Sequence, residues 1–115
     1  VLLIGPTHRV YMAGMALAGA EAFETPLGVV PTDRDLVAAV MESTAVSVRR
    51  DVHAEEHSME VQLPFLQVVA PYTPVVPLAI GDVDTQQVAA VIERALALPG
   101  VAIHPDLAAF AATLS

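Results

Sequence analysis

The amino-acid sequence predicts an α/β fold in which a mainly parallel or mixed sheet is flanked by helices. Two short apolar runs, at 1–4 and 74–81, are closed by glycine and are typical of buried strands. In the second half of the chain such runs alternate with segments whose apolar residues recur at helical spacing. This alternation favours right-handed βαβ units, and we expect a single domain over residues 1–115.

The first half of the chain predicts one strand, one ambiguous segment and one helix. The strand at 1–4 ends at a Gly-Pro turn, whereas residues 10–30 fit either a poor helix or a pair of short strands, because glycines interrupt an alanine-rich run. Prolines in the second part of that run favour extended structure. Thr32 and Asp35 resemble the start of a capping box, and the apolar spacing that follows predicts a helix over 33–42.

A strand and a kinked helix are expected next. Residues 46–52 alternate valine with polar residues, which predicts a half-buried strand that leads into His53. A helix is expected over 54–63, and Pro64 should kink or restart it because proline lacks an amide proton and clashes with the preceding turn. One face of this helix would carry an apolar stripe toward the core: Met59, Leu63 and Leu66.

The last third of the chain carries the clearest signals. A strand is predicted within 74–81, and Asp84 with Gln87 forms a capping-box pattern that opens an amphipathic helix. A short strand at 101–103 and a terminal helix at 107–114 complete the predicted elements.

Composition narrows the class of protein. Hydrophobic residues make up 55% of the chain, which is enough for a true core. With 13 acidic residues against 5 arginines, the net charge of −8 argues against a nucleic-acid partner, which requires a basic surface. Without cysteine the chain has neither a disulfide nor a thiolate metal ligand.

We expect this chain neither to span a membrane nor to enter the secretory route. Apolar runs stay below the roughly 18 residues that a membrane-spanning helix needs, and the N-terminus does not resemble a signal peptide. We therefore expect a soluble cytoplasmic protein. Because the sequence begins within a strand-like run, we also expect it to be a fragment of a longer protein.

Polar residues are densest between His53 and Glu60. The residues from His53 to His57 match H-x-x-E-H, the inverted zinc-protease pattern, in which both histidines would bind zinc and Glu56 would act as general base. Two features weigh against this interpretation. A strand that ends near residue 52 would leave His53 outside the helix, and a third ligand is difficult to supply from the downstream sequence.

A second candidate site combines the end of the first strand with the same polar segment. His8 and Arg9 follow the strand at 1–4, and ligands of open α/β sheets bind beyond the carboxyl ends of strands. His8, His57 and a glutamate would form the ligand set of non-haem Fe(II) enzymes. The alternative is a polar cluster in which His57 and Glu60 bond to each other and bind nothing.

Three sequence blocks, in order, resemble one family. They are GPTHRV at 5–10, FETPLG at 23–28 and EEHSMEVQLPFL at 55–66. Together they are similar to the MEMO-like proteins, called AmmeMemoRadiSam system protein B in prokaryotes. A weaker likeness continues through VVPLAIG to about residue 103.

The resemblance implies a fold and a chemistry. The family is similar in fold to the class III extradiol ring-cleaving dioxygenases, whose metal pocket lies at strand ends. By this likeness His8 corresponds to a metal ligand for Fe(II) or another divalent redox metal. His57 would be an acid/base or substrate-orienting residue whose tautomer Glu60 fixes, with Arg9 and Glu56 beside the substrate.

The chain also departs from the family pattern. The first ligand histidine of the family precedes the point at which this chain begins, and the cysteine ligand belongs to a C-terminal part that is not in this sequence. Asp106 fits a further family motif, but Ala109 stands where the family has a histidine. We therefore expect an incomplete dioxygenase-like core: a central fragment that lacks the family's N-terminal and C-terminal parts and binds metal weakly.

Two functions from different classes remain open at this point. The first is metal-dependent redox work on a small molecule. The second is a non-catalytic regulatory module that uses the same pocket for a peptide or a small anion, which Arg9 beside His8 would favour. In either case we expect exposed sheet edges through which the chain self-associates.

Overall fold

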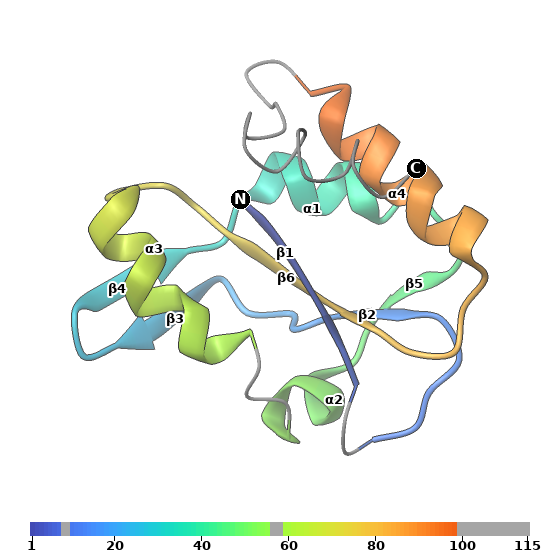
Figure 1. The fold of residues 1–115 in the computed structure, drawn as a ribbon, viewed down its shortest axis with the longest axis horizontal. Coiled ribbons are helices and arrows are strands. Elements are labelled where there is room, and N and C mark those ends of the chain that lie inside the picture. The colour runs from blue at the N-terminus through green and yellow to red at the C-terminus, as the bar shows by residue number, and fades with distance from the viewer. Residues whose placement is uncertain (8–9, 56–58, 99–115) are drawn as a thin grey trace, which may run out of the picture.

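The computed structural model describes residues 1–7, 10–55 and 59–98, which form an α/β arrangement around a four-stranded mixed sheet (Figure 1). The strand order in this sheet is β1-β6-β2-β5, and β3 and β4 form a separate two-stranded sheet. The strands are β1 (Leu2–Pro6), β2 (Met15–Leu17), β3 (Ala22–Thr25), β4 (Gly28–Pro31), β5 (Val46–Val48) and β6 (Val76–Ile80).

The direction of the strands changes in the middle of the sheet. β1 runs parallel to β6, with Pro6 opposite Ile80, whereas β2 runs antiparallel to β6 and parallel to β5. The carboxyl ends of β1 and β6 therefore lie at one end of the sheet. Those of β2 and β5, at Leu17 and Val48, lie at the other end. The sheet has two carboxyl edges instead of one.

Helices cover both faces of the four-stranded sheet. α1 (Arg34–Val40) and α4 (Thr85–Leu96) pack side by side on one face (Figure 1). Their apolar residues join alternate residues of β2 and β6 in the main hydrophobic cluster. Its buried members are Met15, Leu17, Leu36, Val40, Val46, Val76, Leu78, Val91 and Ala95.

The opposite face carries α2 (Arg50–Glu55). A further helix, α3 (Leu63–Val69), packs on the hairpin that β3 and β4 form. The intervening residues of β2 and β6, Ala16 and Ala79, pack with Val52 of α2 in a second cluster. α3 follows a 3-10 turn, η1 (Glu60–Gln62), and packs on β4 in a third cluster that contains Val30 and Leu63. Successive residues of β2 and β6 therefore point to opposite faces of the sheet, one toward α1 and α4 and the next toward α2.

The predicted mixed sheet with flanking helices is confirmed, and residues 10–30 form short strands. The buried character expected for residues 1–4 is wrong: β1 is an edge strand, and Ile4 is 42% exposed. α1 is capped by Asp33, whose carboxylate accepts a hydrogen bond from the Leu36 N–H at 3.1 Å, so the expected Thr32 cap is also wrong. The elements predicted at 101–114 lie outside the described residues.

The polar middle segment differs most from expectation. The strand predicted at 46–52 ends at Val48, and α2 then takes up His53. A continuous helix over 54–63 is wrong, because Met59 is in a turn and Glu60 begins a 3-10 helix. The restart at Pro64 is confirmed, since this residue sits in the first turn of α3, where a missing N–H costs nothing. Met59 and Leu63 are both buried, as the stripe predicted.

No helix in the described part of the chain is long and apolar enough to cross a membrane. The longest is α4, and its capping box is confirmed. The Asp84 carboxylate accepts from the Gln86 N–H at 2.8 Å, and the Gln87 side chain accepts from the Asp84 N–H at 3.4 Å. These bonds satisfy amide groups that the helix itself leaves without a partner.

Asp84→Ala is expected to lower the free energy of unfolding by about 1 kcal/mol, because it removes the acceptor that caps α4. Urea denaturation followed by circular dichroism measures this loss. Asp84→Asn is the matched control, since asparagine caps a helix about as well as aspartate. Equal destabilisation by both variants would show that the charge, and not the cap, stabilises this end of α4.

Candidate functional site

The residues predicted to form the site fall at two points of the chain, and most lie outside the described residues. These are His8, Arg9, Glu56 and His57; Glu60 is described. The contacts of the residues on both sides of 8–9 and of 56–58 locate the ends of these two segments.

The segment that contains His8 starts at the carboxyl edge of β1 and β6. The Thr7 N–H donates to the Ile80 carbonyl at 3.0 Å, which extends the pairing of β1 with β6 by one residue. After the undescribed pair, the Asp82 N–H donates to the Met12 carbonyl at 2.8 Å. The Tyr11 hydroxyl donates to the Asp82 carboxylate at 3.3 Å. Both sides of residues 8–9 are therefore attached to the end of β6.

The residues that flank the undescribed triplet 56–58 pack against the same region. Val52 of α2 precedes it and Met59 follows it, and these side chains are 1% and 5% exposed. Both belong to the hydrophobic cluster that includes Met12, and Val10 packs against that cluster. The chain that follows residues 8–9 and the chain on both sides of residues 56–58 therefore converge on one cluster at one face of the sheet.

His53 is used in a structural contact. Its Nε2 lies 2.7 Å from the backbone carbonyl of Ala16 in β2, and because a carbonyl can only accept, Nε2 carries the proton. This bond ties α2 to the central part of the sheet. A zinc site of the H-x-x-E-H type would have to use the other ring nitrogen of His53. Within residues 1–7, 10–55 and 59–98, no three histidine or acidic side chains group closely enough to hold a metal.

Glu60 lies on the α2 side of the sheet. It begins η1, its side chain is exposed, and it lines a cavity of about 160 Å³ together with His53, Glu24 and Pro77. Its predicted partner, His57, lies outside the described residues.

The start of α2 is fixed by a charged pair. The Arg49 N–H donates to the Leu17 carbonyl at 2.9 Å, and its guanidinium binds both carboxylate oxygens of Asp51, at 2.9 and 2.7 Å. The hydrogen bond from Arg49 lowers the pKa of Asp51 to about 2. The pair therefore fixes the turn between β5 and α2, which carries His53 into place.

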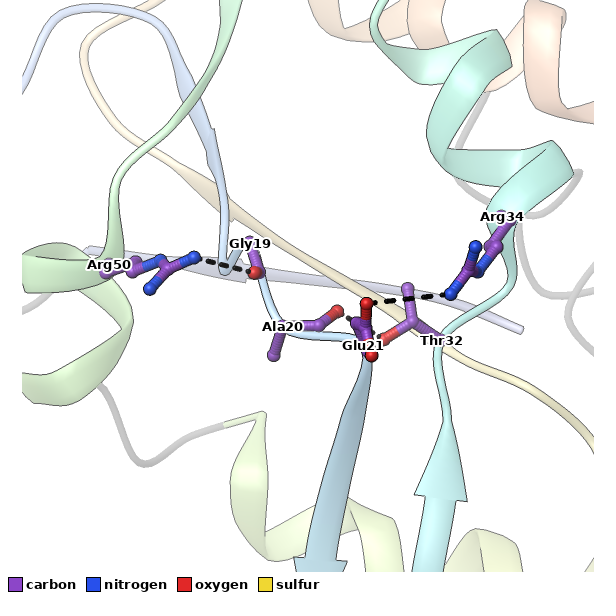
Figure 2. Close-up of polar contacts among 6 residues, drawn as sticks. All are labelled: Gly19, Ala20, Glu21, Thr32, Arg34 and Arg50. Atoms are coloured by element: carbon purple, nitrogen blue, oxygen red, sulfur yellow. Dashed lines mark hydrogen bonds and ion pairs between the residues drawn. The ribbon is translucent and has the colours of Figure 1, made fainter.

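A second cavity, which the sequence did not predict, lies at the other carboxyl edge. It measures about 280 Å³ and is bounded by the loop from Ala18 to Glu21, by α1 and by the end of β5. Figure 2 shows the polar contacts along this loop, with Arg50 on one side and Arg34 on the other. The sequence signal that could have located it is Gly19, which follows a strand end and has a positive φ of 73°.

The sequence blocks agree with the comparison to known proteins. The family model described as Memo-like protein matches residues 1–99. The chain belongs to the Memo-like family. A MEMO1 family protein of Thermotoga sp. (strain RQ2) is 32% identical over 108 residues, which cover 90% of this chain and 39% of that protein.

Other relatives are similar to this Memo-like chain over comparable segments. A MEMO1 family protein of Thermotoga maritima is 35% identical over 109 residues, or 90% of this chain and 39% of that protein. One from Ignicoccus hospitalis is 41% identical over 68 residues, covering 58% of this chain and 24% of that protein. The Memo-like chain therefore spans about two fifths of the length of the two Thermotoga relatives.

His53→Ala is expected to lower the free energy of unfolding by about 1 kcal/mol, because it removes the hydrogen bond between α2 and the Ala16 carbonyl. His53→Gln keeps a side-chain N–H donor at a similar reach and should lose less. Chemical denaturation of both variants measures the difference. If His53→Ala were as stable as the wild type, the contact would have no structural role.

The carboxyl group of Asp51 is expected to titrate with a pKa of about 2, below its ordinary value of 3.8. Since the folded pKa is the lower one, the stabilisation is complete above the unfolded pKa and is lost as the pH falls toward 2. NMR titration of the side-chain carboxyl carbon measures it. Arg49→Gln should return the pKa toward 3.8; an unchanged value would mean that Arg49 is not the cause.

Proposed function

We propose that this Memo-like chain supplies one wall of a metal-binding pocket at the carboxyl edge of β1 and β6, with His8 as a metal ligand. The observation that carries the proposal is the convergence of both candidate segments. Thr7 is bonded to Ile80 at that edge, and Met12 and Met59 share one buried cluster. The residues that flank 8–9 and those that flank 56–58 are therefore attached to β6 or to the cluster beside it.

The described residues do not by themselves fit a metal ion, since they contain no group of three ligand side chains. The proposal therefore assigns ligation to His8 and the completion of the ligand set to groups outside the described ranges. When bound, Fe(II) or another redox-active divalent metal would supply oxidation chemistry on a small molecule. The match to the Memo-like family model over residues 1–99 includes the block in which His8 stands, and this supports the assignment.

The other predicted residues would act on the ligand and its protons. His57 would take up or release a proton near the bound small molecule, because imidazole titrates close to neutral pH. Glu60, at the start of η1, would accept a hydrogen bond from one ring nitrogen and so leave the other free for that transfer. Arg9 and Glu56 would orient a polar substrate, the guanidinium by pairing with an anionic group.

Metal analysis of the anaerobically purified chain tests the proposal. We expect substoichiometric to stoichiometric iron in the wild type and at least a tenfold lower content in His8→Ala, because loss of an imidazole ligand weakens binding strongly. His53→Gln is the matched control and should keep the metal, since Nε2 of His53 is bonded to Ala16.

Two results would contradict the metal assignment. Loss of metal in His53→Gln but not in His8→Ala would favour the H-x-x-E-H pattern instead. Absence of metal from all three proteins would favour the non-catalytic module, in which the pocket binds a peptide or small anion. In that case His8→Ala should weaken peptide binding measured without metal.

A further inference from the structure

The cavity at the second carboxyl edge is separate from the proposed metal pocket. It is lined by Leu17 and Val48, the last residues of the parallel strands β2 and β5, and by Val76 at the start of β6. The segment that contains His8 leaves from the opposite end of β6, beside Ile80. Because ligands of open α/β sheets bind beyond the carboxyl ends of strands, a mixed sheet offers two such positions.

The cavity combines an apolar floor with a charged rim. Its floor is formed by side chains of the main cluster, among them Leu17, Val37 and Val76. On the rim, Arg34 Nη2 lies 3.7 Å from Glu21 Oε1, and the two side chains are 81% and 90% exposed. An ion pair so exposed contributes little to stability, so a ligand can replace either partner.

The wall of the cavity is fixed before any ligand arrives (Figure 2). The Thr32 hydroxyl donates to the Ala20 carbonyl at 2.8 Å, and the Thr32 N–H donates to the Glu21 carbonyl at 2.9 Å. From the other side, Arg50 Nη2 donates to the Gly19 carbonyl at 3.3 Å. Binding therefore need not order this loop, which is typical of small-molecule sites.

Arginine side chains stand on both sides of this loop (Figure 2). Arg34 lines the cavity beside Glu21, whereas Arg50 contacts the loop from outside the lining. Among the described residues, the side chain of Arg50 contacts a backbone carbonyl and pairs with no acid. Guanidinium groups bind carboxylates through paired, charge-assisted hydrogen bonds, and Arg34 lines the cavity itself.

We propose that this cavity binds a small apolar carboxylate, with its hydrocarbon part on the floor and its carboxylate on Arg34. A cavity of about 150 Å³ accommodates benzene. The 280 Å³ at this site is nearly twice that volume, so the ligand has about ten non-hydrogen atoms. An unbranched alkanoate such as octanoate has that size and serves as the probe.

NMR titration of the methyl-labelled chain with octanoate tests the position. We expect shifts at the methyl groups of Val37, Val48 and Val76, with Met12 at the other face unchanged. Octanamide has the same shape without the charge and should bind about three- to tenfold more weakly, as expected for loss of one partly exposed charge-assisted bond.

Substitutions of the two exposed rim residues are expected to change octanoate binding in opposite directions. Arg34→Gln should remove the preference for octanoate over octanamide, whereas Glu21→Gln should strengthen octanoate binding because it removes the competing carboxylate. Arg94→Gln is the matched control: it also removes an exposed arginine, one paired with Glu42 on another surface, and should leave binding unchanged. The methyl spectrum of each variant reports whether it is folded.

Three outcomes would overturn the proposal. They are no methyl shifts around the cavity, shifts confined to the Met12 cluster, and an unchanged preference for octanoate in Arg34→Gln. Equal losses in Arg34→Gln and Arg94→Gln would also contradict it, because the effect would then come from net charge and not from contact with Arg34.

Discussion

The antiparallel pairing of β2 with β6 is the constraint on which the rest of the structure depends. β2 has only three residues, all essentially buried, and they supply both faces of the sheet. The chain enters this pairing through a close backbone approach: the Gly81 N–H donates to the Gly14 carbonyl at 2.9 Å. A Cβ on Gly81 would overlap the Met12 carbonyl oxygen, so a larger residue would push β2 away from β6.

The same pairing separates two chemical environments. The edge formed by β1 and β6 leads toward residues 8–9, whereas the edge formed by β2 and β5 opens on an apolar cavity with arginine beside it. α2 connects them physically. Arg49 binds the Leu17 carbonyl at one edge, and Val52 packs in the cluster that supports the other. The start of α2 and the residue before it thus contact the sheet near both edges.

Local chemistry made parts of this fold predictable from the sequence. α4 follows from its capping box and its apolar spacing, and the restart at Pro64 follows from a missing amide proton. The edge position of β1 was not predictable, because exposure depends on which strands are neighbours. The hydrogen bond of His53 was not predictable either, because its partner, the Ala16 carbonyl, lies 37 residues earlier. The strand that precedes His8 could be located from the sequence, but the second carboxyl edge could not, because it depends on the direction of β2 relative to β6.

The parallel pairing of β1 with β6 joins segments far apart in the chain, as the bond from the Val1 amino group to the Pro74 carbonyl across 73 positions shows. On the ribosome, β1 emerges well before the strand it pairs with. At a synthesis rate of about 5–20 residues per second, that interval is about 4–15 seconds. β1 therefore stays without its pairing partner for longer than any other strand of the four-stranded sheet.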